Sequence, residues 1–202
     1  MNICICDDDC QTHACIQNLI LENSVTKNDH RITSLFSGEE LIQHYQNNQF
    51  FDLILLDVEM EQANGIEAAK KIRQTDEQAI IIFVSSYRQY VFDVFPVGAF
   101  HYIIKPINPK EFAEVFRRSV QKYRDLHAEI CLKWMYDRHN IPIHSIIYLE
   151  GIQRHVIFHT KVARYEGVGK VSDYVDKFIP NGFVQVHHSY IVNISIKATT
   201  SK

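Results

Sequence analysis

Two apolar stretches decide the fold: FDLILLD at residues 51–57 and AIIIFVSS at residues 79–86. Each is almost continuously apolar and ends in polar residues. Such runs are typical of central strands in a parallel sheet that is covered on both faces, because a strand with one exposed face alternates apolar and polar residues. The two runs therefore predict a sheet between two layers of helices.

Shorter apolar runs around residues 3–6, 32–36 and 102–104 extend this pattern, and each is separated from the next by a stretch of helical character. The alternation of strand and helix, five times over, predicts a doubly wound parallel α/β domain. Its last helix is expected after Asn108-Pro109 and carries Phe112 and Phe116 on one stripe. We place the end of this first domain at residue 126.

The pattern changes after residue 130. Short strand-like segments at 145–150, 154–159 and 183–193, with one amphipathic stretch around 171–178, predict a second, smaller and mainly β domain over residues 144–202. Residues 127–143 are interpreted as a linker.

The composition sets further limits. The chain has 202 residues, of which 46% are hydrophobic and 22% charged, so it can build a core. No apolar run reaches the length of a membrane span, and acidic residues stand at the N-terminus where a signal peptide would be basic, so we expect a soluble, cytoplasmic protein with no membrane contact. Five cysteines, four of them before residue 16, do not fit a disulfide framework, and Cys4 and Cys6 fit small core residues better than metal ligands. Residues 127–202 hold nine basic and six acidic side chains, which is compatible with a polyanionic partner.

Chemically active residues follow the predicted strands. The first ends in Asp7-Asp8-Asp9, the third in Asp57, the fourth in Ser85-Ser86 and the fifth in Lys105-Pro106. Because ligands of open parallel sheets bind beyond the carboxyl ends of the strands, these residues are expected to share one site.

Carboxylates gathered at one edge repel one another unless a cation neutralises them, and Mg²⁺ suits such oxygen ligands while leaving positions open for a phosphoryl group. Lys105 would add a positive charge, Ser85 a hydroxyl and Asp57 a nucleophile. Any single aspartate could instead form a turn or a helix cap, as Asp9 could for the first helix.

Residues 1–126 resemble a response-regulator receiver domain. The resemblance rests on the acidic pair Asp7-Asp8, LLDVEM around Asp57, FVSS around Ser85 and FHYIIKP around Lys105. The resemblance implies a flavodoxin-like fold in which Asp57 accepts a phosphoryl group from a histidine kinase or a small phosphodonor.

The same resemblance assigns the other site residues. It implies that Asp7, Asp8, Asp57 and the backbone carbonyl of Glu59 hold Mg²⁺. It implies that Lys105 and Ser85 contact the phosphoryl group, that Tyr102 is the switch aromatic, and that the Lys105-Pro106 bond is cis. Glu61 and Cys10 depart from the family, which often has proline at both positions; Glu61 adds charge near the site, and Cys10 is expected to be inert.

The stretch YRQYVFDVFPVGAF at residues 87–100 has more aromatic surface than one helix needs for packing. Core packing is one explanation. The other, implied by the family, is that this helix forms a surface with the fifth strand and the fifth helix, through which phosphorylation favours a symmetric dimer.

The second domain resembles a LytTR-type DNA-binding domain. The resemblance rests on IIYLEGIQRHVIFHT at 146–160, a helix near VSDYVDKF and GFVQVHHSYIVN at 182–193. The resemblance places Arg154 and His155 in a first DNA-facing loop, and His188 and Ser189 in a second. Since the chain stops before the family's final strands, we expect a shortened domain.

From these observations we predict a two-component response regulator that binds promoter DNA. We expect no enzymatic activity other than its own phosphorylation and dephosphorylation. Two alternatives stay open. One is a signalling adaptor whose second domain binds protein, and the other is a Mg²⁺-dependent phosphatase with an aspartate nucleophile, for which Glu59 would have to serve the leaving group.

Overall fold

The computed structural model describes residues 1–24, 30–60, 64–134 and 137–196, and it divides into two compact units, Met1–Tyr123 and Arg124–Lys202. Each unit has its own buried cluster of apolar side chains. None of the described helices is both long and apolar enough to cross a bilayer.

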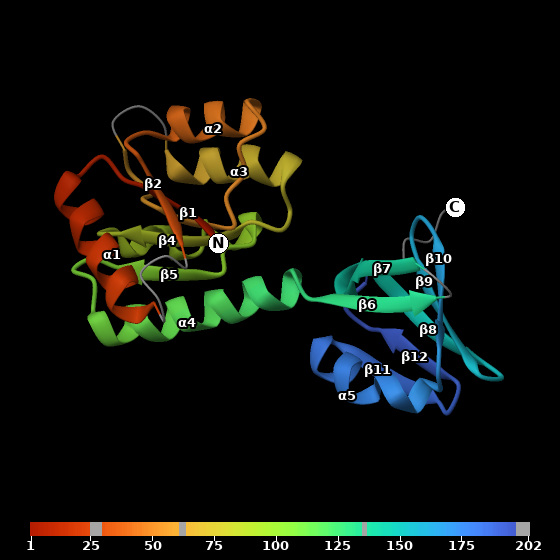
Figure 1. The fold of residues 1–202 in the computed structure, drawn as a ribbon. Helices are drawn as coiled ribbons and strands as arrows, with labels where there is room; N and C mark the ends of the chain where they lie inside the picture. The colour runs from red at the N-terminus through yellow and green to blue at the C-terminus, as the bar shows by residue number, and fades with distance from the viewer. Residues whose placement is uncertain (25–29, 61–63, 135–136, 197–202) are drawn as a thin grey trace. The chain divides into compact units, whose positions relative to one another are not determined.

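The first unit is built on one parallel sheet (Figure 1). Its strands lie in the order β2-β1-β3-β4-β5, and their bounds are β1 Asn2–Cys6, β2 Arg31–Leu35, β3 Leu53–Leu56, β4 Ile80–Ser85 and β5 His101–Ile104. All residues of β3 and β4 are buried, as expected for strands that are covered on both faces. The doubly wound arrangement is confirmed.

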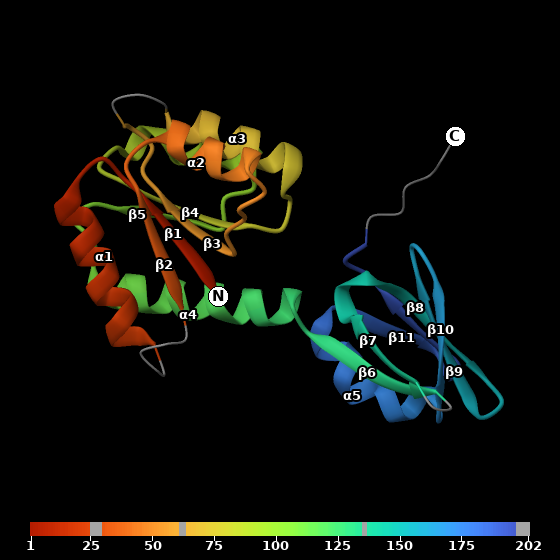
Figure 2. The ribbon, with the colours of Figure 1, turned by 45° about the horizontal axis from the view of Figure 1, so that its top comes forward.

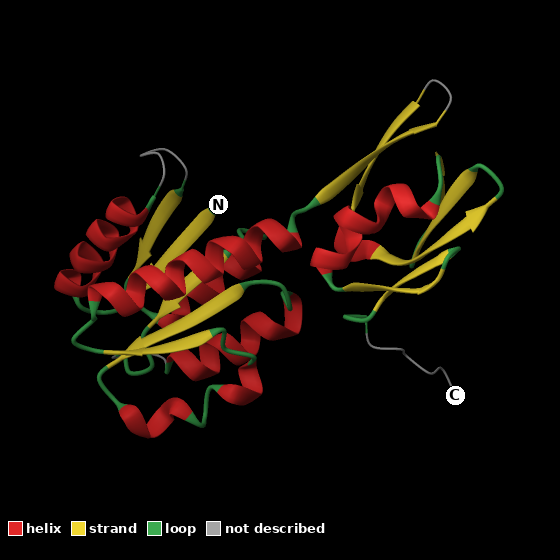
Figure 3. Cartoon of the chain, turned by 90° about the horizontal axis from the view of Figure 1, so that it is seen from below, coloured by secondary structure: helices red, strands yellow, loops and turns green. Residues whose placement is uncertain are grey.

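Four α-helices cover this sheet: α1 Cys10–Asn23, α2 Gly38–Gln46, α3 Gly65–Thr75 and α4 Pro109–Leu126. Helices α1 and α4 lie on one face, while α2 and α3 lie on the other (Figures 1 and 2). Figure 3 shows these helices in red on both sides of the yellow strands. The two layers of helices cover both faces of the sheet, whereas the carboxyl ends of the strands carry the predicted site.

Residues 87–100 differ from the predicted helix. They form two short 3₁₀ turns, η1 Arg88–Val91 and η2 Phe95–Val97. Pro96 cannot donate a backbone hydrogen bond, and Gly98 leaves helical geometry with φ of 63°, so the sequence cannot continue a regular helix here. Val94 and Val97 are buried, whereas Phe92 and Phe95 are 79% and 68% exposed.

The second unit is mainly β, as predicted. Its antiparallel sheet has the order β10-β9-β8-β12-β11, with β8 Ile146–Ile152, β9 His155–Thr160, β10 Arg164–Val168, β11 Phe183–His187 and β12 Tyr190–Asn193. The sequence patterns did not predict β10. The amphipathic stretch forms η4 Val171–Tyr174 and α5 Val175–Phe178, followed by η5 Ile179–Asn181.

The segment interpreted as a linker instead contains a hairpin. Strands β6 Glu129–Trp134 and β7 Asp137–Pro142 pair in antiparallel fashion, and the turn η3 Ile143–Ser145 follows. Ile130, Leu132 and Ile141 belong to the buried cluster of the second unit. These residues are therefore part of the second unit, and its boundary lies near residue 124 rather than residue 144.

Candidate functional site

The pairing of the parallel strands assembles the predicted site. Cys6 of β1 pairs with Leu56 of β3, so Asp7 and Asp57 each follow a paired residue. On the other side, Ser85 of β4 pairs with Ile104 of β5, directly before Lys105. The sheet itself thus brings these side chains to one edge, as the sequence predicted.

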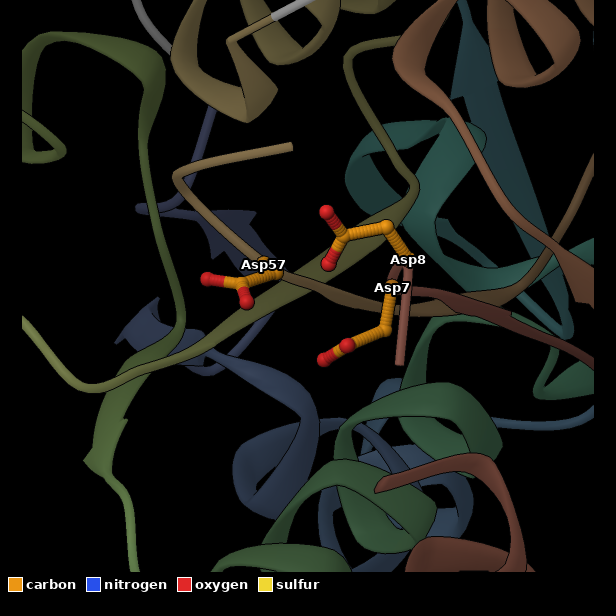
Figure 4. A group of neighbouring side chains, drawn as sticks. All are labelled: Asp7, Asp8 and Asp57. Carbon is orange, nitrogen blue, oxygen red and sulfur yellow. The ribbon is translucent and has the colours of Figure 1, made fainter. Parts of the chain in front are cut away.

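Three carboxylates form the centre of this edge. Oxygen atoms of Asp7, Asp8 and Asp57 lie within 4.8 Å of one another, and Figure 4 shows their carboxyl groups around a common space. Asp7 and Asp57 are 1% and 7% exposed, whereas Asp8 is exposed. Clustered carboxylate oxygens with one side open to solvent fit a hard divalent cation such as Mg²⁺, which keeps part of its water shell.

Lys105 already supplies one positive charge. Its Nζ donates to Oδ2 of Asp7 at 2.8 Å and to Oδ2 of Asp57 at 2.7 Å. Burial favours neutral Lys105, but the hydrogen bonds to both carboxylates outweigh it and raise the pKa of this amine. Burial also raises the pKa of Asp7, although the bond to Lys105 opposes the shift. One lysine does not balance three carboxylates, so the site retains a net negative charge.

Backbone groups orient the two buried carboxylates. Oδ1 of Asp57 accepts from the backbone N–H of Val58 at 2.6 Å and, more weakly, from that of Glu59 at 3.4 Å. The backbone N–H of Asp9 donates to Oδ1 of Asp7 at 3.0 Å. With one oxygen held by the backbone and the other by Lys105, neither carboxylate can rotate freely.

A histidine that no motif singled out supports this arrangement. Nε2 of His13, on the buried side of α1, donates to the carbonyl oxygen of Asp7 at 2.7 Å. Its ring packs on Phe36 with the ring centroids 4.7 Å apart. A single histidine in a helix gives no sequence signal for such a contact, because its partner is set by how α1 packs on the sheet.

Helix α3 begins very close to the proposed phosphoacceptor. The backbone N–H of Gly65 donates to the carbonyl oxygen of Val58 at 2.8 Å. A Cβ atom at Gly65 would lie 1.9 Å from the carbonyl oxygen of Asp57, so only glycine fits here. Asn64 caps the helix by accepting from the backbone N–H of Ile66 at 2.8 Å.

Asp9 has a structural role. Its side chain caps α1 by accepting from the backbone N–H groups of Gln11 and Thr12 at 2.9 and 3.2 Å. These contacts, with a bond from the Thr12 hydroxyl, lower the pKa of Asp9. The alternative interpretation as a helix cap is confirmed for this aspartate. Cys10, the first residue of α1, is exposed, and Glu61 lies outside the described residues.

Ser85 and Tyr102 lie on the other side of the site. Oγ of Ser85 is fully buried and has no hydrogen-bond partner among the described residues. The Tyr102 hydroxyl donates to the carbonyl oxygen of Tyr87, and its ring stacks on Phe83 with the centroids 6.4 Å apart. The predicted cis bond between Lys105 and Pro106 is present.

The side chain of Glu59 makes a contact that the sequence did not reveal. Its Oε1 accepts from the Tyr90 hydroxyl at 2.7 Å, and this carboxylate also raises the pKa of Tyr87. The backbone of Glu59 therefore contacts Asp57 of the acidic site, while its side chain contacts residues 87–90 through Tyr90.

In the second unit, the two predicted DNA-facing loops lie at the same end of the sheet. Arg154 is exposed in the turn between β8 and β9, and His155 begins β9 with its Nδ1 3.3 Å from Glu166. His188 and Ser189 form the turn between β11 and β12, and His188 is exposed. The backbone N–H of Gly151 donates to the carbonyl oxygen of Ser189 at 2.8 Å, which joins the two turns.

Comparison with known families supports both parts of this description. Residues 3–117 match the response regulator receiver domain, and residues 136–198 match the LytTr DNA-binding domain. The chain belongs to the response regulator family. Its architecture of a receiver followed by a LytTR domain is that of the LytR/AlgR type.

Several proteins resemble this response regulator. The transcriptional regulatory protein LytR of Staphylococcus aureus (strain N315) is 29% identical over 173 residues, which cover 77% of this chain and 69% of LytR. The transcriptional regulatory protein YpdB of Escherichia coli (strain K12) is 22% identical over 171 residues, covering 78% of this chain and 70% of YpdB.

Two solved structures share the receiver fold. The response regulatory domain of mrkE from Klebsiella pneumoniae superposes with a TM-score of 0.56 at 22% identity, covering 61% of this chain and 98% of that one. A CheY-like receiver from Methanospirillum hungatei JF-1 gives 0.52 at 24% identity, covering 61% and 95%. These two likenesses bear on the fold alone.

Proposed function

We propose that this protein is a two-component transcription regulator in which Asp57 accepts a phosphoryl group and the second unit binds promoter DNA. The observation that carries the proposal is the cluster of Asp7, Asp8 and Asp57 with Lys105 bonded to two of its members. The phosphoryl donor is a sensor histidine kinase or a small phosphodonor. Both proposed partners, kinase and promoter, place the protein in the cytoplasm.

The residues have complementary roles in the transfer. A carboxylate oxygen of Asp57 attacks phosphorus, and the bond between phosphorus and the donor atom breaks, leaving an acyl phosphate on Asp57. The carboxylates of Asp7, Asp8 and Asp57 and the carbonyl of Glu59 would hold Mg²⁺, which neutralises charge on the phosphoryl oxygens when it is bound.

Lys105 and Ser85 would contact the phosphoryl group once it is attached to Asp57. Lys105 sits 2.7 Å from Asp57 and can follow the added negative charge onto the phosphoryl oxygens. The buried Ser85 hydroxyl, which has no partner in the described structure, can donate to a phosphoryl oxygen. Tyr102 is the proposed switch aromatic and would follow Ser85.

Phosphorylation is proposed to favour a symmetric dimer through residues 87–100, β5 and α4. Phe92 and Phe95 offer exposed aromatic surface there, with ring centroids 6.3 Å apart. Two copies of the second unit would then meet a repeated DNA site, with Arg154, His155, His188 and Ser189 in the contacting turns.

The phosphoacceptor is tested with acetyl phosphate and Mg²⁺, followed by intact-protein mass spectrometry. The wild type should gain one phosphoryl group, and Asp57→Asn should gain none because it loses the nucleophile while keeping its shape. Asp93→Asn, which changes an exposed aspartate, is the matched control and should behave as the wild type. Uptake by Asp57→Asn would refute the assignment, and repeated turnover of a phosphoester would favour a phosphatase.

DNA binding is tested by fluorescence anisotropy of promoter fragments from the protein's own operon, with and without beryllofluoride, at two salt concentrations. Arg154→Ala should weaken binding and lower the slope against salt by about one if the guanidinium contacts a phosphate. Lys161→Ala removes an exposed cation from the turn between β9 and β10 and is the control. If no promoter fragment binds while dimerisation still responds to beryllofluoride, the proposal of a DNA partner is refuted and a protein partner is favoured for the second unit.

A further inference from the structure

Residues 87–98 are held to the rest of the first unit by polar side chains at both ends. At one end, the Glu59 carboxylate accepts a hydrogen bond from the Tyr90 hydroxyl at 2.7 Å, and the Tyr102 hydroxyl donates to the carbonyl oxygen of Tyr87. The Glu59 carboxylate raises the pKa of both Tyr90 and Tyr87. At the other end, Arg73 of α3 donates from Nε to the carbonyl oxygen of Val97 at 2.8 Å and from a terminal nitrogen to that of Gly98 at 3.3 Å.

Between these two attachments the segment has little to hold it. Its two 3₁₀ turns have no side-chain caps, and Phe92 and Phe95 are exposed. Only Val94 and Val97 are buried. Short 3₁₀ turns with few apolar contacts open at low cost in free energy, so each polar attachment has a large effect on the segment.

Glu59 also touches the phosphoacceptor. Its backbone N–H points to Oδ1 of Asp57 at 3.4 Å, two residues away along the chain. The Glu59 carboxylate is not a member of the cluster of Asp7, Asp8 and Asp57, but it and Asp57 both raise the pKa of Tyr87 and, in addition to burial, that of Tyr102, so the two carboxylates face the same pair of tyrosines. A negative charge added at Asp57 repels the Glu59 carboxylate. At the far end of the segment, the hydrogen bonds that Arg73 donates to the carbonyl oxygens of Val97, Gly98 and Asp76 involve no carboxylate.

We propose that Glu59 is a positioning residue which, through Tyr90, restrains residues 87–91 while Asp57 is unmodified, and that charge gained at Asp57 weakens this restraint and frees Phe92. The second half of this inference rests on the proposed phosphorylation of Asp57; the first half does not. Tyr90 and Phe92 also line a groove of about 470 Å³ against α3, so the restraint sets the shape of that groove.

The restraint is tested by hydrogen exchange of the unmodified full-length chain. In Tyr90→Phe, the amides of residues 88–95 should exchange about threefold to tenfold faster, because the bond to a charged acceptor is lost. Tyr45→Phe is the matched control, since it removes another tyrosine hydroxyl from a carboxylate, that of Asp76 at 3.3 Å. The control should leave exchange in residues 88–95 unchanged, and an unchanged rate in Tyr90→Phe would overturn the restraint.

The coupling to charge is tested with Glu59→Gln in a constant concentration of Mg²⁺. The glutamine oxygen can still accept from Tyr90, so exchange before modification should stay close to that of the wild type. Adding beryllofluoride should accelerate exchange of residues 88–95 in the wild type but not in Glu59→Gln, which a purely structural role would not explain. Equal acceleration in both proteins, or none in the wild type with beryllofluoride bound, would overturn the coupling. Failure of Asp57 to bind beryllofluoride or to accept phosphoryl would instead refute the proposed function.

Discussion

Replacing Gly65 with alanine tests whether the start of α3 positions the phosphoacceptor. The new Cβ would stand 1.9 Å from the carbonyl oxygen of Asp57, and this oxygen belongs to the backbone, so no side-chain rotation relieves the clash. The helix has to retreat by about 1 Å at its first residue, which is overpacking at a cost of about 1–3 kcal/mol.

Two further effects adjust this figure. The retreat weakens the 2.8 Å hydrogen bond from the Gly65 N–H to the Val58 carbonyl, which costs about 1 kcal/mol of stability. In the other direction, alanine stabilises the folded state by about 0.5–1 kcal/mol relative to glycine at a compatible position, because it restricts the unfolded chain. We expect the free energy of unfolding of the first unit to fall by about 1–3 kcal/mol. Uptake of phosphoryl from acetyl phosphate should fall at least about tenfold, because a displaced Asp57 loses its alignment with its partners.

Urea unfolding followed by far-UV circular dichroism measures the stability term. The only tryptophan lies in β6 of the second unit, so the fluorescence transition serves as an internal control and should not move. Glu67→Ala, which changes an exposed residue in the first turn of α3, should shift the free energy of unfolding by less than about 0.5 kcal/mol. If Gly65→Ala unfolds at the urea concentration of the wild type and accepts phosphoryl normally, the close approach does not position Asp57.

Three other perturbations have expected outcomes. Lys105→Met removes the cation between Asp7 and Asp57 and should lower the free energy of unfolding by about 1–3 kcal/mol at pH 7. Folding raises the pKa of Lys105, so the stability that its charge contributes is fully present below its ordinary pKa of 10.5 and is lost as the pH rises through the pKa of the folded state. Urea unfolding should therefore show that the difference in unfolding free energy between the wild type and Lys105→Met shrinks at strongly alkaline pH. Mg²⁺ should raise the Tm of the wild type, as measured by calorimetry. Asp8→Asn keeps both hydrogen bonds of Lys105, so its Tm without Mg²⁺ should be no lower than that of the wild type, while the rise in Tm on adding Mg²⁺ should be smaller. Phe112→Ala empties a site that is 1% exposed and should cost about 3–5 kcal/mol by urea unfolding, and a cost below about 1 kcal/mol would mean that α4 is not packed as described.

The strand-end site could be predicted from sequence because a parallel sheet leaves little freedom in where its strands end. Asp7, Asp57 and Lys105 each follow an apolar run, and the pairing of those runs decides their proximity. The contacts of His13 and Glu59 could not be predicted, because they depend on how a helix packs and on where residues 87–90 lie.

The other differences also have physical reasons. Residues 87–100 have enough apolar residues for a helix, but Pro96 and Gly98 interrupt it and only part of the apolar surface reaches the core. In the hairpin of residues 129–142, the buried Ile130 and Leu132 alternate with Glu129 and the exposed Cys131, which is a strand signal that the polar run around His139 obscured. Strand β10 contains Gly167, which packs against Phe158 where a larger side chain would be crowded, so its sequence has few of the residues typical of a strand.

The pairing of Cys6 with Leu56 has a consequence for how this chain tolerates change. Side chains alternate between the two faces of a strand, so deleting one residue within β3 would turn Asp57 away from Asp7 even if every acidic residue were kept. Insertions in the connections between strands leave that pairing intact. The connections of the first unit can therefore lengthen without separating Asp7 from Asp57, whereas a changed number of residues inside β1 or β3 would break the site as surely as the loss of an aspartate.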